Sequence, residues 1–252
     1  MVEASRPKII AAIPAYNEES TIGKLVLKVK EHVDQVIIIN DGSHDNTIEA
    51  AKAAGAIVIN HVKNKGYGEA IKSCFEVARA KSADILVTLD GDGQHNPDEI
   101  PKLIAPLLNQ EADLVIGSRL LRPRQQVSMP RYRAFGISVI TFLFNLGSRT
   151  KVSDSQSGFR AYSKKVLESF LLSEKGMSIS IETLEKARKV GAIIKEVPII
   201  CLYPSSPFNL KAIKHGLCVA LSVLRLRLKN SLLTRTGKGE RAQNISHHTG
   251  SK

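Results

Sequence analysis

Residues 85–95 read ILVTLDGDGQH, an apolar run followed at once by two carboxylates. The run at 85–89 predicts a short buried strand, because four to eight apolar residues bounded by turn residues are typical of one. Gly91 and Gly93 let the backbone turn sharply where the run ends. The two carboxylates can therefore face one ligand at the edge of a sheet.

Asp90 and Asp92 supply the oxygen ligands that a hard divalent cation prefers. Such an ion, Mg²⁺ or Mn²⁺, also bridges to phosphate oxygens, and the amide oxygen of Gln94 can be a further ligand. The pattern indicates a site for a nucleoside diphosphate. Asp-Gly pairs are also common in tight turns, so a plain turn is the alternative while this spacing is taken alone.

Strands and helices alternate along the first half of the chain. The expected strands span residues 8–13, 36–40, 56–60, 85–89 and 114–117, and the expected helices span 21–33, 46–54, 68–80 and 97–108. Continuous apolar strands separated by helices are typical of a parallel sheet with helices on both faces. The expected fold class is α/β, with a mostly parallel, Rossmann-like central sheet.

The second half of the chain is less regular. We expect a loop rich in arginine over 119–133, a helix over 134–146, a strand over 158–162, a helix over 179–190 and a strand over 193–202. Pro198 interrupts the last strand and favours a place at the sheet edge.

Three polar clusters follow predicted strands, at residues 14–18, 41–45 and 90–94. The carboxyl ends of parallel strands meet at one edge of a sheet, and ligands of α/β proteins bind beyond that edge. The three clusters are therefore expected to form one site.

The composition points to an anionic partner, since the net charge is +12 and the pI is about 9.7 over 252 residues. Nucleic acid, a phosphorylated substrate and an acidic membrane face all fit this charge. A nucleic-acid binder would need stacking aromatics among its basic residues. Aromatic content is only 5% and tryptophan is absent, so nucleic acid ranks last.

The sequence predicts a cytoplasmic protein. The N-terminus has no apolar core typical of a signal peptide, and we find no run of about 18 uncharged apolar residues that would span a bilayer. Cys74, Cys201 and Cys218 stand apart in apolar contexts, which favours buried thiols in a reducing compartment.

Six motifs occur in order: PAYNE at 14–18, NDGSHDNT at 40–47, NKGYG at 64–68, DGDGQ at 90–94, GSR at 117–119 and DSQSGFRAY at 154–162. In these the chain resembles family 2 glycosyltransferases with the GT-A fold, over roughly residues 8–203. Within that family it is similar to the dolichyl-phosphate mannose synthases and polyprenyl-phosphate glucosyltransferases.

The resemblance implies roles by position. The implied nucleotide-sugar-binding residues are Pro14, Ala15, Tyr16, Glu18, Asp41, Asp90 and Gly91, and the implied metal ligands are Asp90, Asp92 and Gln94. The acceptor phosphate is expected at Arg119 and at a second basic residue after Pro130, best matched by Arg133 with Arg131 as its rival. Asp92, Arg119 and Arg133 are the expected catalytic residues.

The resemblance also implies that a hexose (mannose, glucose or N-acetylglucosamine) passes from a GDP or UDP sugar to a polyprenyl (dolichyl) phosphate. A phosphate acceptor needs no general base, because its second ionisation lies near pH 6 by analogy with phosphoserine. It needs cations, and the cluster Arg119, Arg122, Arg124, Arg131 and Arg133 offers them. A solvated basic loop is the alternative for this cluster.

Residues 134–144 and 217–228 are apolar, with arginines nearby, and suit an interfacial position on anionic lipid. Packing in the core or against a partner is the alternative. We expect peripheral contact with the cytoplasmic face of a membrane. The expected division is a catalytic domain over 1–204, an amphipathic helix over 205–233 and a disordered basic tail over 234–252.

Several assignments stay open at this point. Asp154 could orient sugar hydroxyls, anchor an arginine or close its loop through an ion pair with Arg160, and the role of Glu182 is undefined. His95 could add a metal ligand or lie behind the ligands. The segment 201–211 lacks the arginine expected of mannose synthases, which makes UDP as plausible as GDP.

Two further classes of enzyme remain as alternatives. A related transferase could use a soluble or protein-linked acceptor. A sugar-phosphate nucleotidyltransferase would need a glycine-rich loop with arginine and lysine after the first strand, and residues 14–18 have neither.

Overall fold

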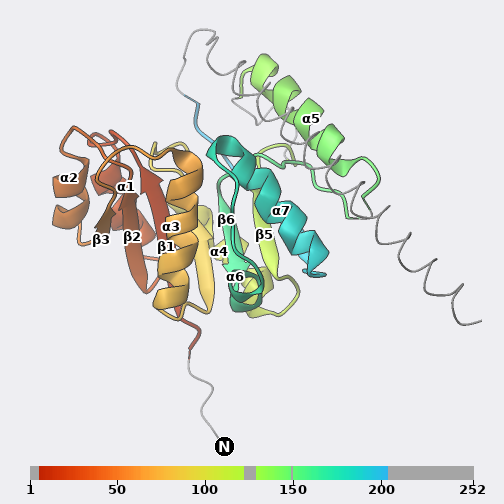
Figure 1. The fold of residues 1–252 in the computed structure, drawn as a ribbon, viewed down its shortest axis with the longest axis horizontal. Coiled ribbons are helices and arrows are strands. Elements are labelled where there is room, and N and C mark those ends of the chain that lie inside the picture. The colour runs from red at the N-terminus through yellow and green to blue at the C-terminus, as the bar shows by residue number, and fades with distance from the viewer. Residues whose placement is uncertain (1–5, 122–128, 149, 204–252) are drawn as a thin grey trace, which may run out of the picture.

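The computed structural model describes residues 6–121, 129–148 and 150–203, which form a seven-stranded sheet flanked by helices (Figure 1). The strand order is β3-β2-β1-β4-β6-β5-β7. The strands are β1 Ile9–Ala15, β2 Gln35–Asn40, β3 Ile57–Asn60, β4 Ile85–Thr88, β5 Leu114–Ser118, β6 Arg160–Ser163 and β7 Ile194–Pro198. Neighbouring strands are parallel except where β6 pairs with β4 and with β5. The predicted mostly parallel α/β sheet is confirmed.

The helices cover both faces of this sheet. They are α1 Ile22–Val29, α2 Thr47–Ala53, α3 Tyr67–Ala80, α4 Ile100–Leu108, α5 Arg131–Asn145, α6 Lys164–Ser169 and α7 Ile179–Lys189, with short 3₁₀ turns at Pro97–Glu99 and Gly176–Ser178. Side chains of a strand alternate between faces, so each strand serves two cores. Ile10 packs with residues of α3, α6 and α7, whereas Ile9 and Ala11 pack with residues of α1 and α4.

Two strand ends differ from the prediction. β1 does not stop before Pro14 but runs through it to Ala15. β4 pairs with β1 only as far as Ala12, so Pro14, which lacks an N–H, stands where β1 has β2 as its only described neighbour. The predicted edge position of the strand containing Pro198 is confirmed, since β7 is the last strand of the described sheet.

α5 begins three residues earlier than predicted. Pro130 is its N-cap, so Arg131 and Arg133 belong to the first helical turn and not to a loop. α6 was not predicted at all, although Ser163 marks its start by accepting a hydrogen bond from the Val166 N–H.

The carboxyl ends of the parallel strands lie at the top of Figure 1, since the chain enters β1 from below. α5 lies beyond the sheet at the upper right. No helix within the described ranges is long and apolar enough to cross a membrane. The predicted amphipathic helix over 205–233 and the predicted tail lie outside the described residues.

Candidate functional site

The loops after β1, β2 and β4 meet at one edge of the sheet, as their positions after the strands predict. The Asp41 N–H donates to the carbonyl of Ala15 at 2.9 Å, which joins the second loop to the first. The Thr21 hydroxyl donates to the carbonyl of Gly91 at 2.9 Å, which joins the third. A side chain at Gly91 would put its Cβ 3.0 Å from the carbonyl oxygen of Pro14, so glycine permits this close contact.

Three carboxylates share this edge. Burial raises the pKa of Asp92, and the charge of Asp90 raises it further. Burial also raises the pKa of Glu18, followed in effect by the charge of Asp92. Each group thus feels the negative charge of another. A cation would relieve this repulsion.

Asp90 is held in place by two side chains and is still partly exposed. The Tyr67 hydroxyl donates to Asp90 Oδ1 at 3.2 Å, and His95 Nε2 lies 3.3 Å from Oδ2. The Asp90 side chain keeps 34% of its surface exposed, whereas His95 keeps 3%, so a ligand reaches Asp90 but not His95. Gly158 leaves room for this carboxylate, because a Cβ there would lie 2.7 Å from either oxygen.

His95 is therefore a partner of Asp90 placed away from the ligand side. Burial alone would lower the pKa of His95, but the hydrogen bond to Asp90 raises it to about 9. Burial likewise opposes ionisation of Asp90, and the contact with His95 outweighs it, so the pKa of Asp90 is lowered. The imidazolium keeps Asp90 ionised.

The donor set fits a hard divalent cation that also binds phosphate. No group of three or more histidine, cysteine, aspartate or glutamate side chains in the described ranges forms a complete metal cage. Mg²⁺ is commonly held by one or two carboxylates together with substrate phosphates, and Asp90 and Asp92 match that pattern. Gln94 follows them, and its N–H donates to Asp92 Oδ1 at 3.0 Å.

Arg119 is held by Asp154 in a buried, two-point ion pair. Its Nε donates to Asp154 Oδ2 at 2.7 Å and its Nη2 to Oδ1 at 2.9 Å. Of the roles left open for Asp154, the structure shows that it anchors an arginine. Burial alone would lower the pKa of Arg119, but Asp154 raises it above its usual range.

Arg133 lies near both Asp92 and Tyr203. Its charge lowers the pKa of Asp92, although less than burial and Asp90 raise it. Its guanidinium carbon is 5.6 Å from the centre of the Tyr203 ring. No carboxylate of the described residues forms an ion pair with Arg133, and its Nε is buried without a hydrogen-bond partner there. Arg131 is exposed, whereas Arg133 is half-buried and lies near Asp92.

Tyr203 was missed by the sequence reasoning. Its hydroxyl accepts from Arg119 Nη1 at 3.4 Å, so it touches both arginines assigned to the acceptor. Burial raises the pKa of this tyrosine. It lies 84 residues from Arg119, and only a known strand order could have placed it there.

Two other residues singled out from the sequence act inside the fold. Arg160 is fully buried and donates to the carbonyls of Ser180 and Ser155 at 2.9 and 2.8 Å. Glu182 accepts from the N–H groups of Ser173 and Glu174, and so fixes the segment before α7. Arg122 and Arg124 lie outside the described residues.

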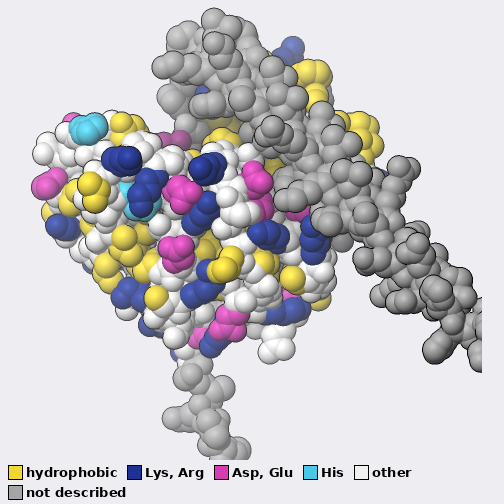
Figure 2. Space-filling view, in the orientation of Figure 1, with side chains coloured by type: hydrophobic (Ala, Val, Ile, Leu, Met, Phe, Trp, Pro, Cys, Tyr) yellow, Lys and Arg dark blue, Asp and Glu magenta, His cyan; other side chains and the backbone are white. Residues whose placement is uncertain are grey.

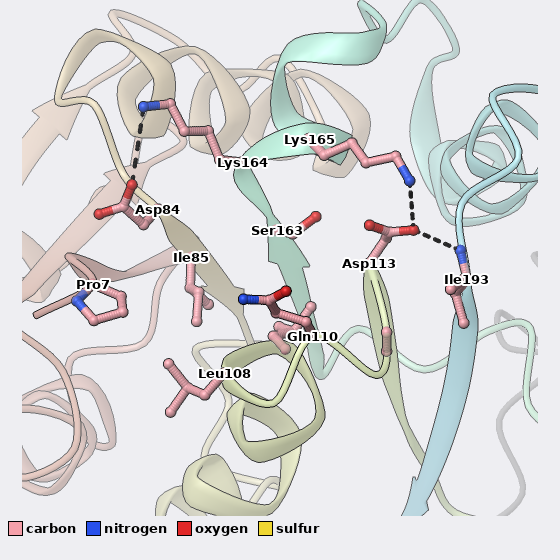
Figure 3. Close-up of a pocket in the computed structure, with 12 residues that line it drawn as sticks. Pro7, Asp84, Ile85, Leu108, Gln110, Asp113, Ser163, Lys164, Lys165 and Ile193 are labelled. Carbon is pink, nitrogen blue, oxygen red and sulfur yellow. Dashed lines mark hydrogen bonds and ion pairs between the residues drawn. The ribbon is translucent and has the colours of Figure 1, made fainter. Parts of the chain in front are cut away.

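A cavity of about 630 Å³ lies at the opposite edge of the sheet (Figure 3). Its lysines already have partners, because Lys164 Nζ lies 3.9 Å from Asp84 Oδ1 and Lys165 Nζ lies 2.9 Å from Asp113 Oδ2. Its lining includes residues that precede β1, β4 and β5, so it does not belong to the site.

The fold and the clustered acids define an α/β protein with an acidic site at the carboxyl edge of its parallel strands. Comparison with known proteins gives the family: residues 10–171 match glycosyl transferase family 2. A UDP-N-acetylglucosamine–dolichyl-phosphate N-acetylglucosaminyltransferase of Methanococcus voltae is 39% identical over 220 residues, covering 77% of this chain and 86% of that one. The dolichyl-phosphate hexose transferase of Haloferax volcanii is 27% identical, covering 92% and 99%.

A solved structure gives the same result. Glucosyl-3-phosphoglycerate synthase of Mycobacterium tuberculosis, in complex with Mn²⁺ and UDP-glucose, superposes with a TM-score of 0.66 at 26% identity, covering 86% of this chain and 79% of that one. The chain belongs to glycosyl transferase family 2. It is a glycosyltransferase with the GT-A fold, similar to the dolichyl-phosphate sugar transferases.

Proposed function

We propose that this enzyme transfers a hexose from a nucleoside diphosphate sugar to a polyprenyl phosphate, with inversion at the anomeric carbon and with Mg²⁺ or Mn²⁺ bound. The observation that supports the proposal is an acidic cluster with a basic cluster beside it. Carboxylates at Glu18, Asp90 and Asp92 form the acidic side of the site. Arg119 and Arg133, which both contact Tyr203, form its basic side and lie close enough to lower the pKa values of Asp90 and Asp92.

The acidic side is assigned to the donor. Asp90, Asp92 and Gln94 would hold the divalent cation against the diphosphate, where it stabilises the charge of the leaving group. The loop of Pro14, Ala15, Tyr16 and Glu18 is assigned to the nucleoside, beside Gly91. Of the nucleotides we favour UDP, because the Methanococcus voltae relative is named for UDP-N-acetylglucosamine.

The basic side is assigned to the acceptor. A phosphate oxygen of the polyprenyl phosphate attacks the anomeric carbon, the bond from that carbon to the diphosphate breaks, and the nucleoside diphosphate leaves. The phosphate arrives already ionised, so no side chain has to remove a proton. Arg119 and Arg133 would hold this anion beside the donor, since guanidinium groups bind phosphate through paired donors. Direct attack on an α-linked donor gives a β-linked sugar phosphate.

α5 offers a surface for the membrane that carries such a lipid. Phe135, Val139 and Phe142 recur at helical spacing, and 72%, 39% and 64% of their respective surfaces are exposed. Apolar side chains stand out at the upper right of Figure 2, where α5 lies. Arg131 at the start of the helix complements anionic headgroups. We propose peripheral membrane contact through this face.

A soluble acceptor is the second candidate, favoured by the likeness to glucosyl-3-phosphoglycerate synthase. A nucleic-acid role has less support, because lysine and arginine are interspersed with aspartate and glutamate on the face shown in Figure 2.

The test is a panel of UDP-N-acetylglucosamine, UDP-glucose and GDP-mannose, each with Mn²⁺ or Mg²⁺ and with either a polyprenyl phosphate or 3-phosphoglycerate. We expect nucleoside diphosphate release that requires the lipid and the metal, and a β-linked product. Release with 3-phosphoglycerate alone would establish the soluble acceptor. No release with any pair, or release that persists in EDTA, would overturn the proposed function.

A further inference from the structure

Three polar side chains form a hydrogen-bonded chain beside the site, and two of them, His61 and Ser73, have no role in the function proposed above. His61 follows β3, and its Nδ1 lies 2.7 Å from Asp41 Oδ1. Its Nε2 lies 2.9 Å from Ser73 Oγ on α3. His61 and Asp41 are 6% and 4% exposed, so the contact is sheltered from solvent.

Asp41 also fixes the backbone of the loop between β3 and α3. Its Oδ1 accepts from the Lys65 N–H at 2.9 Å, and its Oδ2 accepts from the Gly66 N–H at 2.8 Å. Burial opposes ionisation of Asp41, but the hydrogen bonds from His61 and from this loop outweigh it, so its pKa is lowered. An ionised carboxylate only accepts, so His61 Nδ1 is the donor.

The residue that follows this loop, Tyr67, contacts Asp90 of the predicted metal-binding motif. Gly66 has a positive φ of 90°, and Tyr67 then opens α3 with its hydroxyl donating to Asp90 Oδ1 at 3.2 Å. The contacts therefore run without a break from His61 through Asp41, Lys65–Gly66 and Tyr67 to Asp90.

We propose that His61 is a positioning residue: by holding Asp41 it sets the loop that places Tyr67 on Asp90, and so the geometry in which the nucleoside diphosphate binds. The inference rests on the proposed function, and it deepens the role of Asp41. Three of the roughly four lone-pair positions of that carboxylate are already taken by this chain. One position stays open for the donor, so Asp41 can bind the nucleotide while it also shapes the loop around it.

The arrangement of serine, histidine and aspartate also occurs in serine hydrolases. Here the aspartate also accepts two hydrogen bonds from the loop backbone, which connects the three side chains to the donor site. We therefore assign it to positioning and not to nucleophilic attack.

Two substitutions separate the two contacts of His61. His61→Asn keeps an amide donor near the place of Nδ1 and loses the contact with Ser73. His61→Gln places its amide near Nε2 and loses the donor to Asp41. Arg79→Met is the matched control, because Arg79 lies at the far end of α3, donates to the carbonyl of Phe170 at 2.7 Å and is remote from the site.

The measurements are kcat/KM for the donor, the KM of the lipid acceptor, UDP and GDP affinity by calorimetry with Mn²⁺, and the melting temperature. We expect His61→Gln to lose about tenfold or more in kcat/KM and in nucleotide affinity, as losses of supporting contacts at metal sites commonly do. His61→Asn should stay within a few-fold of wild type, and Arg79→Met should lose stability alone. Acceptor KM should not change.

Tyr67→Phe gives a second, independent reading. If His61 acts through the loop, the double variant with His61→Gln should lose less than the product of the two single losses. The assignment would be overturned by any of three results. The Asn and Gln variants could lose equally in kcat/KM, the Gln variant could keep wild-type kcat/KM and nucleotide affinity, or the losses of the double variant could be fully multiplicative. Wild-type protein that binds neither UDP nor GDP would count instead against the proposed function.

Discussion

Replacing Asp154 by asparagine tests the ion pair that holds Arg119 at the acceptor side. The Asp154 side chain is 0% exposed and that of Arg119 is 15% exposed, so the pair is screened little by solvent. Asparagine keeps the shape but leaves a buried guanidinium without its counter-charge. Removing one partner of a buried ion pair costs about 3–5 kcal/mol. At about 2–4 °C per kcal/mol for a chain of this size, the melting temperature should fall by roughly 6–20 °C.

The assay is thermal and urea unfolding of the wild type and the variant, with a matched control. Lys195 and Glu111 form an exposed pair at 2.7 Å, with side chains 44% and 50% exposed, so Glu111→Gln should leave the melting temperature unchanged. Arg119→Met combined with Asp154→Leu removes both charges and should recover much of the loss. If Asp154→Asn costs less than about 1 kcal/mol, the pair does not hold Arg119 as described.

Three further predictions follow from the site and the fold. Asp92→Asn should abolish turnover while the melting temperature holds or rises, because burial and Asp90 already oppose its charge; undiminished nucleoside diphosphate release would remove Asp92 from the metal site. Arg133→Ala should raise the acceptor KM at least tenfold with donor affinity unchanged, whereas Arg131→Ala should not; equal effects in steady-state kinetics would contradict the choice between them. The pKa of Glu182 is lowered, because its hydrogen bonds outweigh burial, so its stabilising effect should be complete above about pH 4.3 and lost as the pH falls through its folded pKa. Melting curves of wild type and Glu182→Gln from pH 7 to 3 should therefore converge, and parallel curves would refute this.

The strands and the position of the site could be predicted because both depend on local sequence. The run at 85–89 is apolar without alternation, which indicates burial on both faces, and β4 is buried throughout. Polar clusters directly after such strands have to lie at their carboxyl edge. Asp90 and Glu18 therefore came together as expected, although no contact between them could be derived from spacing.

The features that could not be predicted from the sequence depend on contacts between segments far apart in the chain. β6 is antiparallel to both neighbours, and nothing in the four residues Arg160–Ser163 sets a direction. Arg119 and Asp154 are 35 residues apart, so either could have paired elsewhere. The start of α5 was predicted three residues too far along the chain, because Pro130 was taken for a loop residue. Pro130 is instead the N-cap of this helix. Proline is tolerated at a helix start, since the N–H it lacks has no partner there.

The charged groups of the site are of two kinds, those with a fixed partner of opposite charge and those without one. Asp90 and Arg119 each have a fixed partner of opposite charge, in His95 and in Asp154. Such groups are held in place before any ligand arrives and cost no reorganisation during the reaction. Asp92 and Arg133 have no such partner among the described side chains, and each is kept from full solvation by its surroundings. The charges without a fixed partner among the described residues are thus negative at Glu18 and Asp92 and positive at Arg133. A cation with its diphosphate would compensate the negative charges and a phosphate the positive one, which is the pair of ligands that a sugar transfer between two phosphates requires.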